Sequence, residues 1–438
     1  MRKLLMTATA VVGAMGLAVA AHAAPASGMQ SGLGGDGTIF GPTTSYPGPT
    51  NLPGQIQFYF RGRLHFDMMV GGDSIDHGKG TKSGNIFFGE YARLYSGFEG
   101  TAANGMQFGA FLEVRQNGGG LGSSTGGNTL IFRREVGYFK GNWGQIRFGQ
   151  TDSNSGLFQT GNFENFDDGG ANGDLPGLFS GNAQVDWPFP ENSGMYTTGK
   201  VVYLSPSFSG FDFGVSYEPN FSGNGDAGGC GTSAAVSGSS CNRASTIPGG
   251  GQFRRNTFDI TGRYQGKLGP VGVAAMVGVI TAGHVNNTSA PASNPTTVQF
   301  GTVISMGGLA VGGDVITGNT NGTGYSAVTP LEKGGKRETA FIVGTSYAFG
   351  PFIVGASYLN ETMQGAYGTG AGGANTTRHQ QAIAAGGTYA WAPGVASFVS
   401  FIYEHRHQLG YDFNTASAGP DQNNTRAMGM LIGNTFNW

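Results

Sequence analysis

Residues 55–68, QIQFYFRGRLHFDM, alternate apolar and polar side chains residue by residue. One set of alternate positions holds large apolar residues and a glycine, and the other holds Gln, Tyr, Arg, His and Asp. Because successive side chains of a β-strand point to opposite faces, this pattern predicts a strand with one apolar and one polar face. Residues 108–114 and 211–217 repeat the pattern. We therefore expect a chain built of amphipathic strands.

The links between these strands alternate in length. Short links at 141–142, 267–270 and 350–351 are separated by long Gly-, Asn-, Ser- and Asp-rich stretches such as 151–198 and 219–251. This asymmetry predicts an all-β fold, a transmembrane antiparallel β-barrel with tight turns at one rim and long loops at the other. Sixteen strands are expected, at 55–70, 84–99, 105–117, 130–140, 143–150, 199–206, 210–218, 254–266, 270–281, 298–306, 309–317, 335–349, 351–362, 378–391, 395–407 and 425–438.

An even strand count allows the barrel to close without an unpaired edge in lipid. The pair at 298–317 is the weakest assignment, since this region is glycine-rich and alternates poorly. Fourteen and eighteen strands are therefore the alternatives to sixteen.

The N-terminus predicts export. Arg2 and Lys3 precede an apolar stretch that ends at Ala21-His22-Ala23, which is typical of a signal peptide over residues 1–23. An N-terminal extension, 24–54, and the barrel, 55–438, then make up the mature chain. No later stretch approaches the roughly 18 apolar residues that a transmembrane helix needs. Loss of two of the 24 basic residues against 26 acidic ones gives the mature chain a net charge of −4, which argues against a nucleic-acid partner.

The two cysteines, Cys230 and Cys241, lie in one Gly- and Ser-rich segment. After export, an oxidising compartment favours a disulfide between them, which would stabilise the protein by about 3 kcal/mol at most. Two free thiols or a metal-binding pair are the alternative.

Two runs resemble a known family. FRREVGYFKGNWGQIRFGQ, at 132–150, is similar to the paired strands before the inward-folded third loop of Gram-negative general diffusion porins, and KVVYLSPSFSGFDFGVSY, at 200–217, is similar to the hairpin after it. The resemblance implies an outer-membrane homotrimer in lipid, with a water-filled channel for passive diffusion of small hydrophilic solutes and ions. The last strand places Met430, Ile432, Phe436 and Trp438 on one face, and so resembles the signal that outer-membrane barrels present to their assembly machinery.

In that family the third loop narrows the lumen opposite a wall of arginines. The matching loop here, 151–198, contains no Lys or Arg, and its candidate constriction residues are Glu164, Asp167, Asp168 and Asp174. The candidate basic wall consists of Arg61, Arg63, Arg93, Arg115, Arg133 and Arg147, on the polar faces of the early strands. Opposed charges across water would create a transverse field that favours polar solutes. The simpler explanation is that any loop in water collects Asp and any lumen wall collects Arg.

Other side chains leave alternatives open. The loop aromatics Phe158, Phe163, Phe166, Phe179, Trp187 and Phe189 are expected to anchor the loop to the wall, and a sliding path for sugars is the alternative. Glu90 falls on an otherwise apolar face, which indicates either a subunit contact or an error of one residue in the register. His405 and His407 are spaced to share one face of a strand, and are expected to be solvated rather than to bind a metal.

No enzyme class is indicated. The sequence has no His-Glu-x-x-His, no Gly-x-Ser-x-Gly, no phosphate-binding Gly-x-x-x-x-Gly-Lys-Ser/Thr and no zinc spacing of Cys and His, so no cofactor is expected. The alternative to a diffusion channel is a barrel that acts in surface binding or adhesion through its long loops. An outer-membrane hydrolase is a third hypothesis, which would need a Ser-His or Asp-His cluster at the barrel rim.

Overall fold

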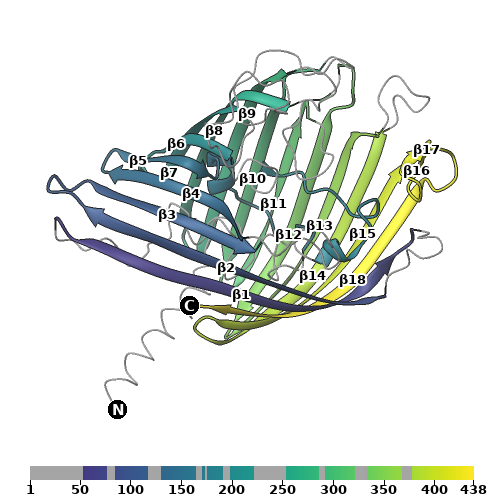
Figure 1. The fold of residues 1–438 in the computed structure, drawn as a ribbon, viewed down its shortest axis with the longest axis horizontal. Coiled ribbons are helices and arrows are strands. Elements are labelled where there is room, and N and C mark those ends of the chain that lie inside the picture. The colour runs from purple at the N-terminus through teal and green to yellow at the C-terminus, as the bar shows by residue number, and fades with distance from the viewer. Residues whose placement is uncertain are drawn as a thin grey trace.

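Sixteen strands form one closed antiparallel barrel (Figure 1). The computed structural model describes residues 53–75, 84–116, 130–163, 170–172, 175–190, 198–220, 253–285, 292–320, 331, 333–366 and 377–438. The barrel strands are β1 (Ile56–Asp73), β2 (Ile86–Thr101), β3 (Gln107–Gln116), β4 (Leu130–Gly141), β5 (Gly144–Thr151), β6 (Thr198–Leu204), β7 (Phe211–Asn220), β8 (Phe253–Leu268), β9 (Val271–Val285), β10 (Thr296–Met306), β11 (Leu309–Gly318), β12 (Glu338–Phe349), β13 (Phe352–Gln364), β14 (Thr377–Ala392), β15 (Val395–Gln408) and β18 (Asn424–Asn437). The predicted fold class and strand count are confirmed.

In the described part of the chain, four short elements lie outside the barrel wall. The helix α2 (Asn154–Leu157) and the 3-10 helix η2 (Leu175–Leu178) lie between β5 and β6. The two-residue strands β16 (Tyr411–Asp412) and β17 (Ser417–Ala418) pair with each other between β15 and β18. Within the described part of the chain, no helix has the length and apolar character needed to cross a membrane.

The alternating apolar and polar positions of the sequence lie on the outer and inner faces of the barrel wall, respectively. In β1, Phe58 and Phe60 are 76% and 63% exposed on the outer surface, whereas Arg63 and His65 on the inner face are buried. The predicted register is therefore confirmed. An outward apolar face around an inward polar one is the arrangement of a barrel surrounded by lipid.

The glycine-rich region at 298–317 forms two regular strands. β10 and β11 pair residue for residue, from Thr297 opposite Gly318 to Met306 opposite Leu309. In β10 the outward side chains include Phe300 and Ile304, both about half exposed. The weakest assignment from the sequence is thus confirmed, and the alternative counts of fourteen and eighteen are wrong.

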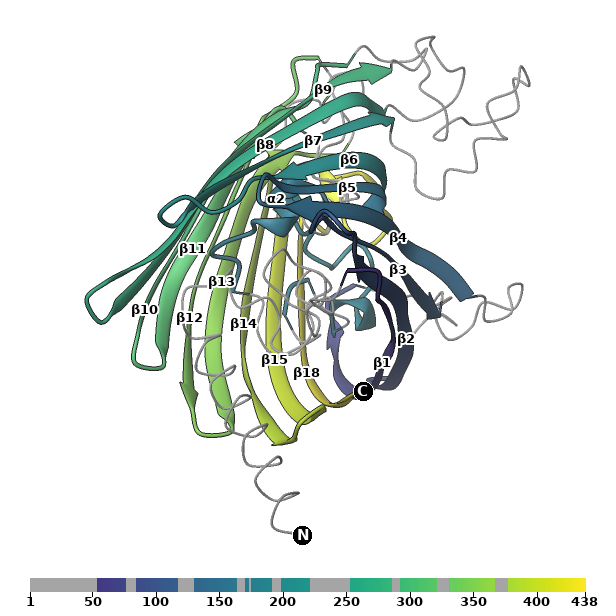
Figure 2. The ribbon, with the colours of Figure 1, turned by 90° about the vertical axis from the view of Figure 1, so that its left-hand side faces the viewer.

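The first and last strands close the ring. β1 pairs with β18, and Figure 2 shows the C-terminus beside β1. Two hydrogen bonds of 3.1 Å, from Gly62 N to Trp438 O and from Trp438 N to Gly62 O, hold the last residue to β1. Because the indole of Trp438 lies over Gly62, any side chain at that position would overlap the ring. Closure satisfies the backbone groups that an open edge would expose to lipid.

The two rims differ as the sequence predicts. The links 142–143, 269–270, 307–308, 350–351 and 393–394 are tight turns, all at the rim that also holds the C-terminus. Gly394 has φ 81°, which L side chains rarely adopt, and a Cβ there would overlap the Asn437 carbonyl. The strand ends joined by the long connections all lie at the opposite rim, which is the external side in barrels of this kind.

Candidate functional site

The connection between β5 and β6, residues 152–197, is called the inward loop, and its described residues, 152–163, 170–172 and 175–190, lie within the lumen. Its first turn, α2, is bound to the carboxylate of Asp259 on β8. Asp259 accepts hydrogen bonds from Asn154 Nδ2 at 2.9 Å, from the Ser155 amide at 2.8 Å and from Ser155 Oγ at 2.6 Å. Figure 2 shows α2 inside the ring of strands. The loop therefore begins by crossing to the wall of β8 instead of extending outside the barrel.

Inward-facing glycines give the loop backbone room to lie against the wall. A Cβ at Gly301 in β10 would overlap the Thr160 carbonyl oxygen, and one at Gly344 in β12 would overlap Phe163. Conversely, a Cβ at Gly161, whose φ is 95°, would overlap the Gly313 carbonyl in β11. Gly301 and Gly344 thus leave room for the loop on the inner face of β10 and β12, and we call this part of the wall the glycine groove. Gly301 lies in the region 298–317 where the sequence alternates poorly.

Polar contacts fix the loop in this groove. Gln159 Nε2 donates to Asp314 on β11, and Gln299 on β10 donates to both Gln159 Oε1 at 3.0 Å and Asp314 at 2.6 Å. The guanidinium of Arg263 on β8 lies 4.3 Å from the centre of the Phe158 ring, a cation–π contact. Residues 154–163 are thus held on the wall from β8 to β12.

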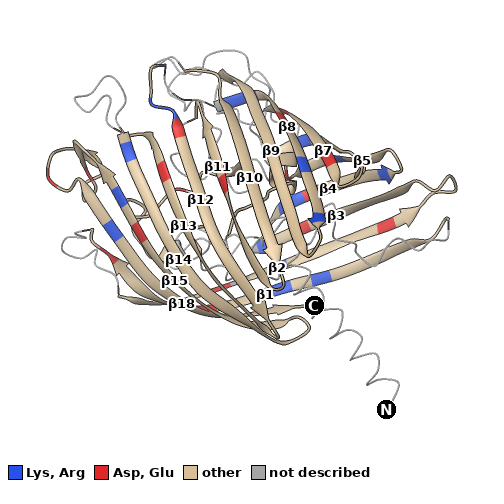
Figure 3. Ribbon diagram, turned by 180° about the vertical axis from the view of Figure 1, so that it is seen from behind, with Lys and Arg blue, Asp and Glu red and all other residues tan. Residues whose placement is uncertain are grey.

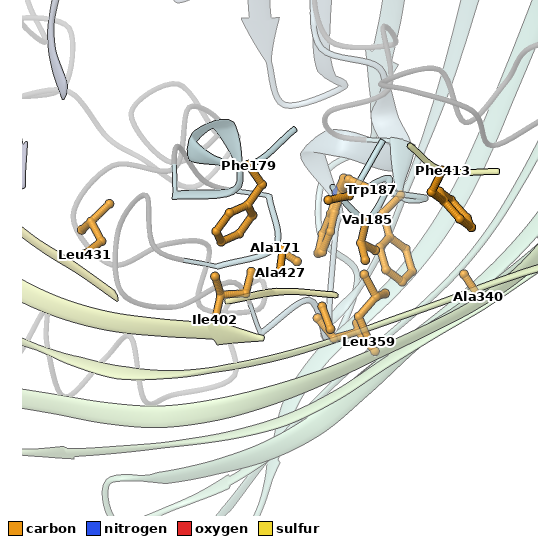
Figure 4. Packing of buried hydrophobic residues seen from close by; sticks show 14 of the residues in the cluster. Ala171, Phe179, Val185, Trp187, Ala340, Leu359, Ile402, Phe413, Ala427 and Leu431 are labelled. Carbon is orange, nitrogen blue, oxygen red and sulfur yellow. The ribbon is translucent and has the colours of Figure 1, made fainter. Parts of the chain in front are cut away.

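The described loop aromatics act as anchors, as predicted. Phe158, Phe163, Phe179, Trp187 and Phe189 are all buried. Figure 4 shows Phe179, Val185 and Trp187 over apolar side chains of the wall, with Val185 and Trp187 toward Phe413. Because their rings are covered, they do not offer a sliding surface for a solute. Phe166 lies outside the described residues.

The second half of the loop is bound on the other side of the lumen. Asp186 forms an ion pair of 3.0 Å with Arg406 on β15, and the Val185 amide donates to Glu404 at 3.3 Å. The Ser180 amide donates to Asp73 on β1 at 2.7 Å. The loop is therefore attached to the wall at both ends of its described course.

The six arginines of the predicted basic wall lie on the inner face of β1 to β5. Arg63, Arg93, Arg133 and Arg147 are buried, and Arg61 and Arg115 are partly buried. Arg63 is directly opposite Arg93, which is directly opposite Arg115, so three like charges stand in one row across β1, β2 and β3. In the ring of sixteen strands β2 and β10 are eight strands apart. The arginine row therefore faces the glycine groove that carries the loop.

A β-bulge adds a seventh arginine, which strict alternation would place on the outer face. Between β3 and β4 the register shifts at Glu113 and Val114, and both Arg133 and Arg134 face inward. Glu113 pairs with Arg133 at 3.2 Å, with Arg134, and with Arg93 at 3.9 Å. Arg134 also pairs with the loop residue Asp152 at 2.7 Å. The consecutive polar residues 133–135 are the signal in the sequence for this bulge.

A second buried charge cluster was not predicted. Glu218 on β7 pairs with Arg254 on β8 at 2.8 Å, and Lys200 on β6 lies 3.8 Å from the same carboxylate. Each of these residues faces inward, next to the strand end from which the loop leaves the wall. The alternation of apolar and polar residues in β6, β7 and β8 is the signal in the sequence that could have assigned these three charged side chains to the lumen.

The other predicted site residues are not described by the structure. Glu164, Asp167, Asp168 and Asp174, and the cysteines Cys230 and Cys241, lie outside the described residues. Of the remaining acidic loop residues, Asp152 and Asp186 are in ion pairs with arginines of the wall. Within the described ranges, no group of three or more His, Cys, Asp and Glu side chains is placed to hold a metal.

Comparison with known sequences gives the family. The sequence profile described as Gram-negative porin matches residues 7–407. The chain belongs to the Gram-negative porin family. It is an outer-membrane channel protein with transmembrane β-strands, as the resemblance in the sequence predicts. No curated protein matches this porin significantly.

Solved structures share the fold of this porin at low sequence identity. An anion-selective porin from Comamonas acidovorans has a TM-score of 0.55 and 14% identity, covering 88% of this chain and 100% of its own. The OmpF complex with daunomycin from Salmonella typhi has a TM-score of 0.53 and 14% identity, covering 87% and 97%. OmpT of Vibrio cholerae, in a trimer form, has a TM-score of 0.52 and 14% identity, covering 87% and 99%.

Proposed function

We propose that this porin is a water-filled channel for passive diffusion of small hydrophilic solutes and ions. The observation that carries the proposal is the row of Arg63, Arg93 and Arg115, directly opposite one another across three strands. Glu113 lies 3.9 Å from Arg93 in the same region of the wall, and charged side chains in an apolar interior are costly even when they are paired. A hydrated lumen lowers this cost, and a lumen filled by apolar side chains does not.

The acidic loop residues complete the proposed constriction. Glu164, Asp167, Asp168 and Asp174 follow Phe163, which packs over Gly344 on the wall opposite the early strands. We place these carboxylates across the lumen from the arginine row, where a transverse field would orient dipolar solutes and disfavour apolar ones.

The test is conductance and zero-current potential of the purified protein in a planar bilayer under a salt gradient. The variant Glu164→Gln, Asp167→Asn, Asp168→Asn, Asp174→Asn should shift ion selectivity toward anions. Its matched control is Asp412→Asn, Asp421→Asn in the last external connection, which should leave selectivity unchanged. Equal permeability ratios in all three proteins would place the acidic residues outside the constriction. A folded but electrically silent barrel would overturn the channel itself.

We further propose a homotrimer with the outer face of β2 to β4 at the interface. Glu90 on β2 and Glu135 on β4 are exposed on the outside of the barrel, and Glu90 is directly opposite Phe66. A carboxylate facing hydrocarbon is unfavourable, so this face is better covered by protein than by lipid. The position of Glu90 on the outer face supports the subunit-contact interpretation over a register error.

Cross-linking tests the interface. In a Cys230→Ser, Cys241→Ser background, Glu90→Cys should give covalent dimers with a short bis-maleimide, since one cysteine in each chain can link only two chains. Phe300→Cys, outward on the opposite side of the ring, should not. Cross-links from both positions, or from Phe300→Cys alone, would contradict the proposed interface.

A further inference from the structure

Charged side chains on the outer face of the barrel are separated by sign. Among the described strand residues, the acidic ones on this face are Glu90 on β2 and Glu135 on β4, both exposed. On the other side of β1, Arg426 on β18 is exposed and His405 on β15 is partly exposed, whereas their neighbours along each strand are buried. Figure 3 shows basic residues on β14, β15 and β18 near the ends that lie away from the C-terminus. The outer face thus has an acidic side and a basic side.

These outer charges have no ionic partner within the described part of their own chain. The ion pairs among the described residues join inward-facing groups, and none includes Glu90, Glu135 or Arg426. Glu90 is directly opposite Phe66 on β1, whereas Arg426 is beside Ser74, eight residues further along the same strand. At about 3.3 Å per residue, this offset is about 26 Å, so Glu90 and Arg426 do not meet within one protomer. Unpaired charges on a face toward lipid are unfavourable, which indicates a partner from outside the chain.

The order of strands places the acidic and basic sides next to each other around one apolar strand. The wall runs β14, β15, β18, β1, β2, β3, β4. Between the two sides, β1 presents no charged side chain outward, and its Leu64 and Phe66 are each 43% exposed. In a cyclic trimer, each protomer uses one patch toward one neighbour and a different patch toward the other. With β1 toward the threefold axis, the acidic side of one protomer faces the basic side of the next.

The opposed groups lie at similar depth in the wall. Glu90 is the fifth residue of β2, which begins at Ile86 at the external rim. Arg426 is the third residue of β18, which begins at Asn424 at the same rim, and His405 is directly opposite it on β15. Because the symmetry of a cyclic trimer keeps all protomers at one height in the membrane, groups of similar depth can meet across the interface.

Arg426 and His405 together provide hydrogen-bond donors suited to a carboxylate. Gln381 Nε2 donates to His405 Nδ1 at 3.4 Å, which leaves the Nε2–H group of the ring as its donor. The planar guanidinium of an arginine matches the two oxygens of a carboxylate. His379 and His407 stack beside this pair, with ring centres 6.5 Å apart, and extend the basic side. A glutamate is therefore a suitable ligand for this part of the outer face.

We propose that Arg426 and His405 of one protomer bind the carboxylate of the partner subunit's Glu90, so that the trimer is joined head to tail at three equivalent contacts. The inference rests on the proposed homotrimer and names the side chains that join it. Each of these outer charges then has a partner of opposite sign, and the apolar outer faces of the three β1 strands lie toward the axis. Hydrogen bonds between ionised groups are stronger than those between neutral ones, so the contact also sets the register between subunits.

Cross-linking between the two sides tests the pairing. In a Cys230→Ser, Cys241→Ser background, the variant Glu90→Cys, Arg426→Cys should give covalent trimers with a short bis-maleimide, because each chain is then linked to both neighbours. The offset of about 26 Å prevents a short link within one chain. The control Glu90→Cys, Phe300→Cys, with Phe300 outward on the opposite side of the ring, should give no covalent trimer. Covalent trimers from the control, or none from the test variant, would overturn the pairing.

Charge exchange separates the pairing from the trimer itself. Sedimentation equilibrium of the full-length protein in a mild detergent measures subunit dissociation. Glu90→Arg or Arg426→Glu alone should weaken each interface about 30-fold or more, since the remaining partner is left without a counter-charge. The combined variant Glu90→Arg, Arg426→Glu should restore the affinity to within about threefold of the parent. The control Lys336→Glu, at an exposed position of the same rim, should dissociate as the parent does.

The outcomes distinguish a wrong pairing from a wrong oligomer. Heat-modifiable migration in a gel shows that the barrel of each variant is folded. A combined variant that dissociates as readily as either single variant would overturn the pairing and leave the trimer in place. A parent protein that stays monomeric at every concentration would overturn the proposed homotrimer, and the pairing with it.

Discussion

The attachment of the inward loop to Asp259 predicts a measurable change when that carboxylate is removed. Asp259→Ala deletes the acceptor of three hydrogen bonds from Asn154 and Ser155, with donor–acceptor distances of 2.6 to 2.9 Å. Hydrogen bonds to a charged group contribute about 1.5–3 kcal/mol each, and lumen water replaces part of that loss. We therefore expect docking of this segment to weaken by about 3 kcal/mol, or roughly 100-fold in the undocked population.

Chymotrypsin cleavage reports the undocked population. Leu157 and Phe158 are buried against β6 and β8, so the enzyme cuts after them only when the segment leaves the wall. When opening and closing are fast relative to cleavage, the rate follows the open population. Asp259→Ala should therefore raise the rate of cleavage at these positions roughly 100-fold, and Ser155→Ala roughly tenfold. Mass spectrometry of the fragments identifies the site.

A matched control removes a wall carboxylate that does not hold the loop. Glu99 on β2 accepts a hydrogen bond of 2.5 Å from Tyr138 on β4, far from α2. Glu99→Ala should leave the cleavage rate at Leu157 and Phe158 unchanged. Parent-like cleavage of Asp259→Ala would refute the reasoning, as would acceleration by Glu99→Ala of the same size.

Three other outcomes follow from the structure. Gly301→Val should lower single-channel conductance, since its side chain would push the loop from the groove into the lumen, whereas Gly262→Val, where a Cβ meets nothing within 4 Å, should not. Arg134→Met should lower the temperature at which the barrel unfolds in a heat-modifiability gel, because removing one partner of a buried ion pair costs about 3–5 kcal/mol. Cys230→Ser should lower the free energy of unfolding by about 3 kcal/mol at most if Cys230 and Cys241 are bonded. Thiol alkylation of the parent protein before and after reduction should show two thiols that react only after reduction. Alkylation of both thiols without reduction would contradict the bond.

The sequence was sufficient to predict the barrel because the pattern that specifies each strand lies within that strand. A strand between lipid and water must alternate apolar and polar residues, and residues 55–68 do so without interruption. The strand count followed from turn lengths, including the glycine-rich pair β10 and β11. The inner position of all six predicted arginines follows from the same alternation.

Other features of this porin depend on contacts between residues far apart in the chain, and they become visible only in the folded barrel. The sequence gives no reason for glycine at 301 and 344 within strands. The structure gives one, because Thr160 and Phe163 of the loop pack directly over these two positions. Arg134 turns inward because a bulge shifts the register opposite Glu113, and a periodicity of two cannot encode that shift. The course of the inward loop around the lumen, from Asp259 on β8 to Arg406 on β15, likewise depends on partners more than 100 and 200 residues away in sequence. Alternation thus specifies the face to which a side chain points, and only the closed barrel specifies which side chains meet inside it.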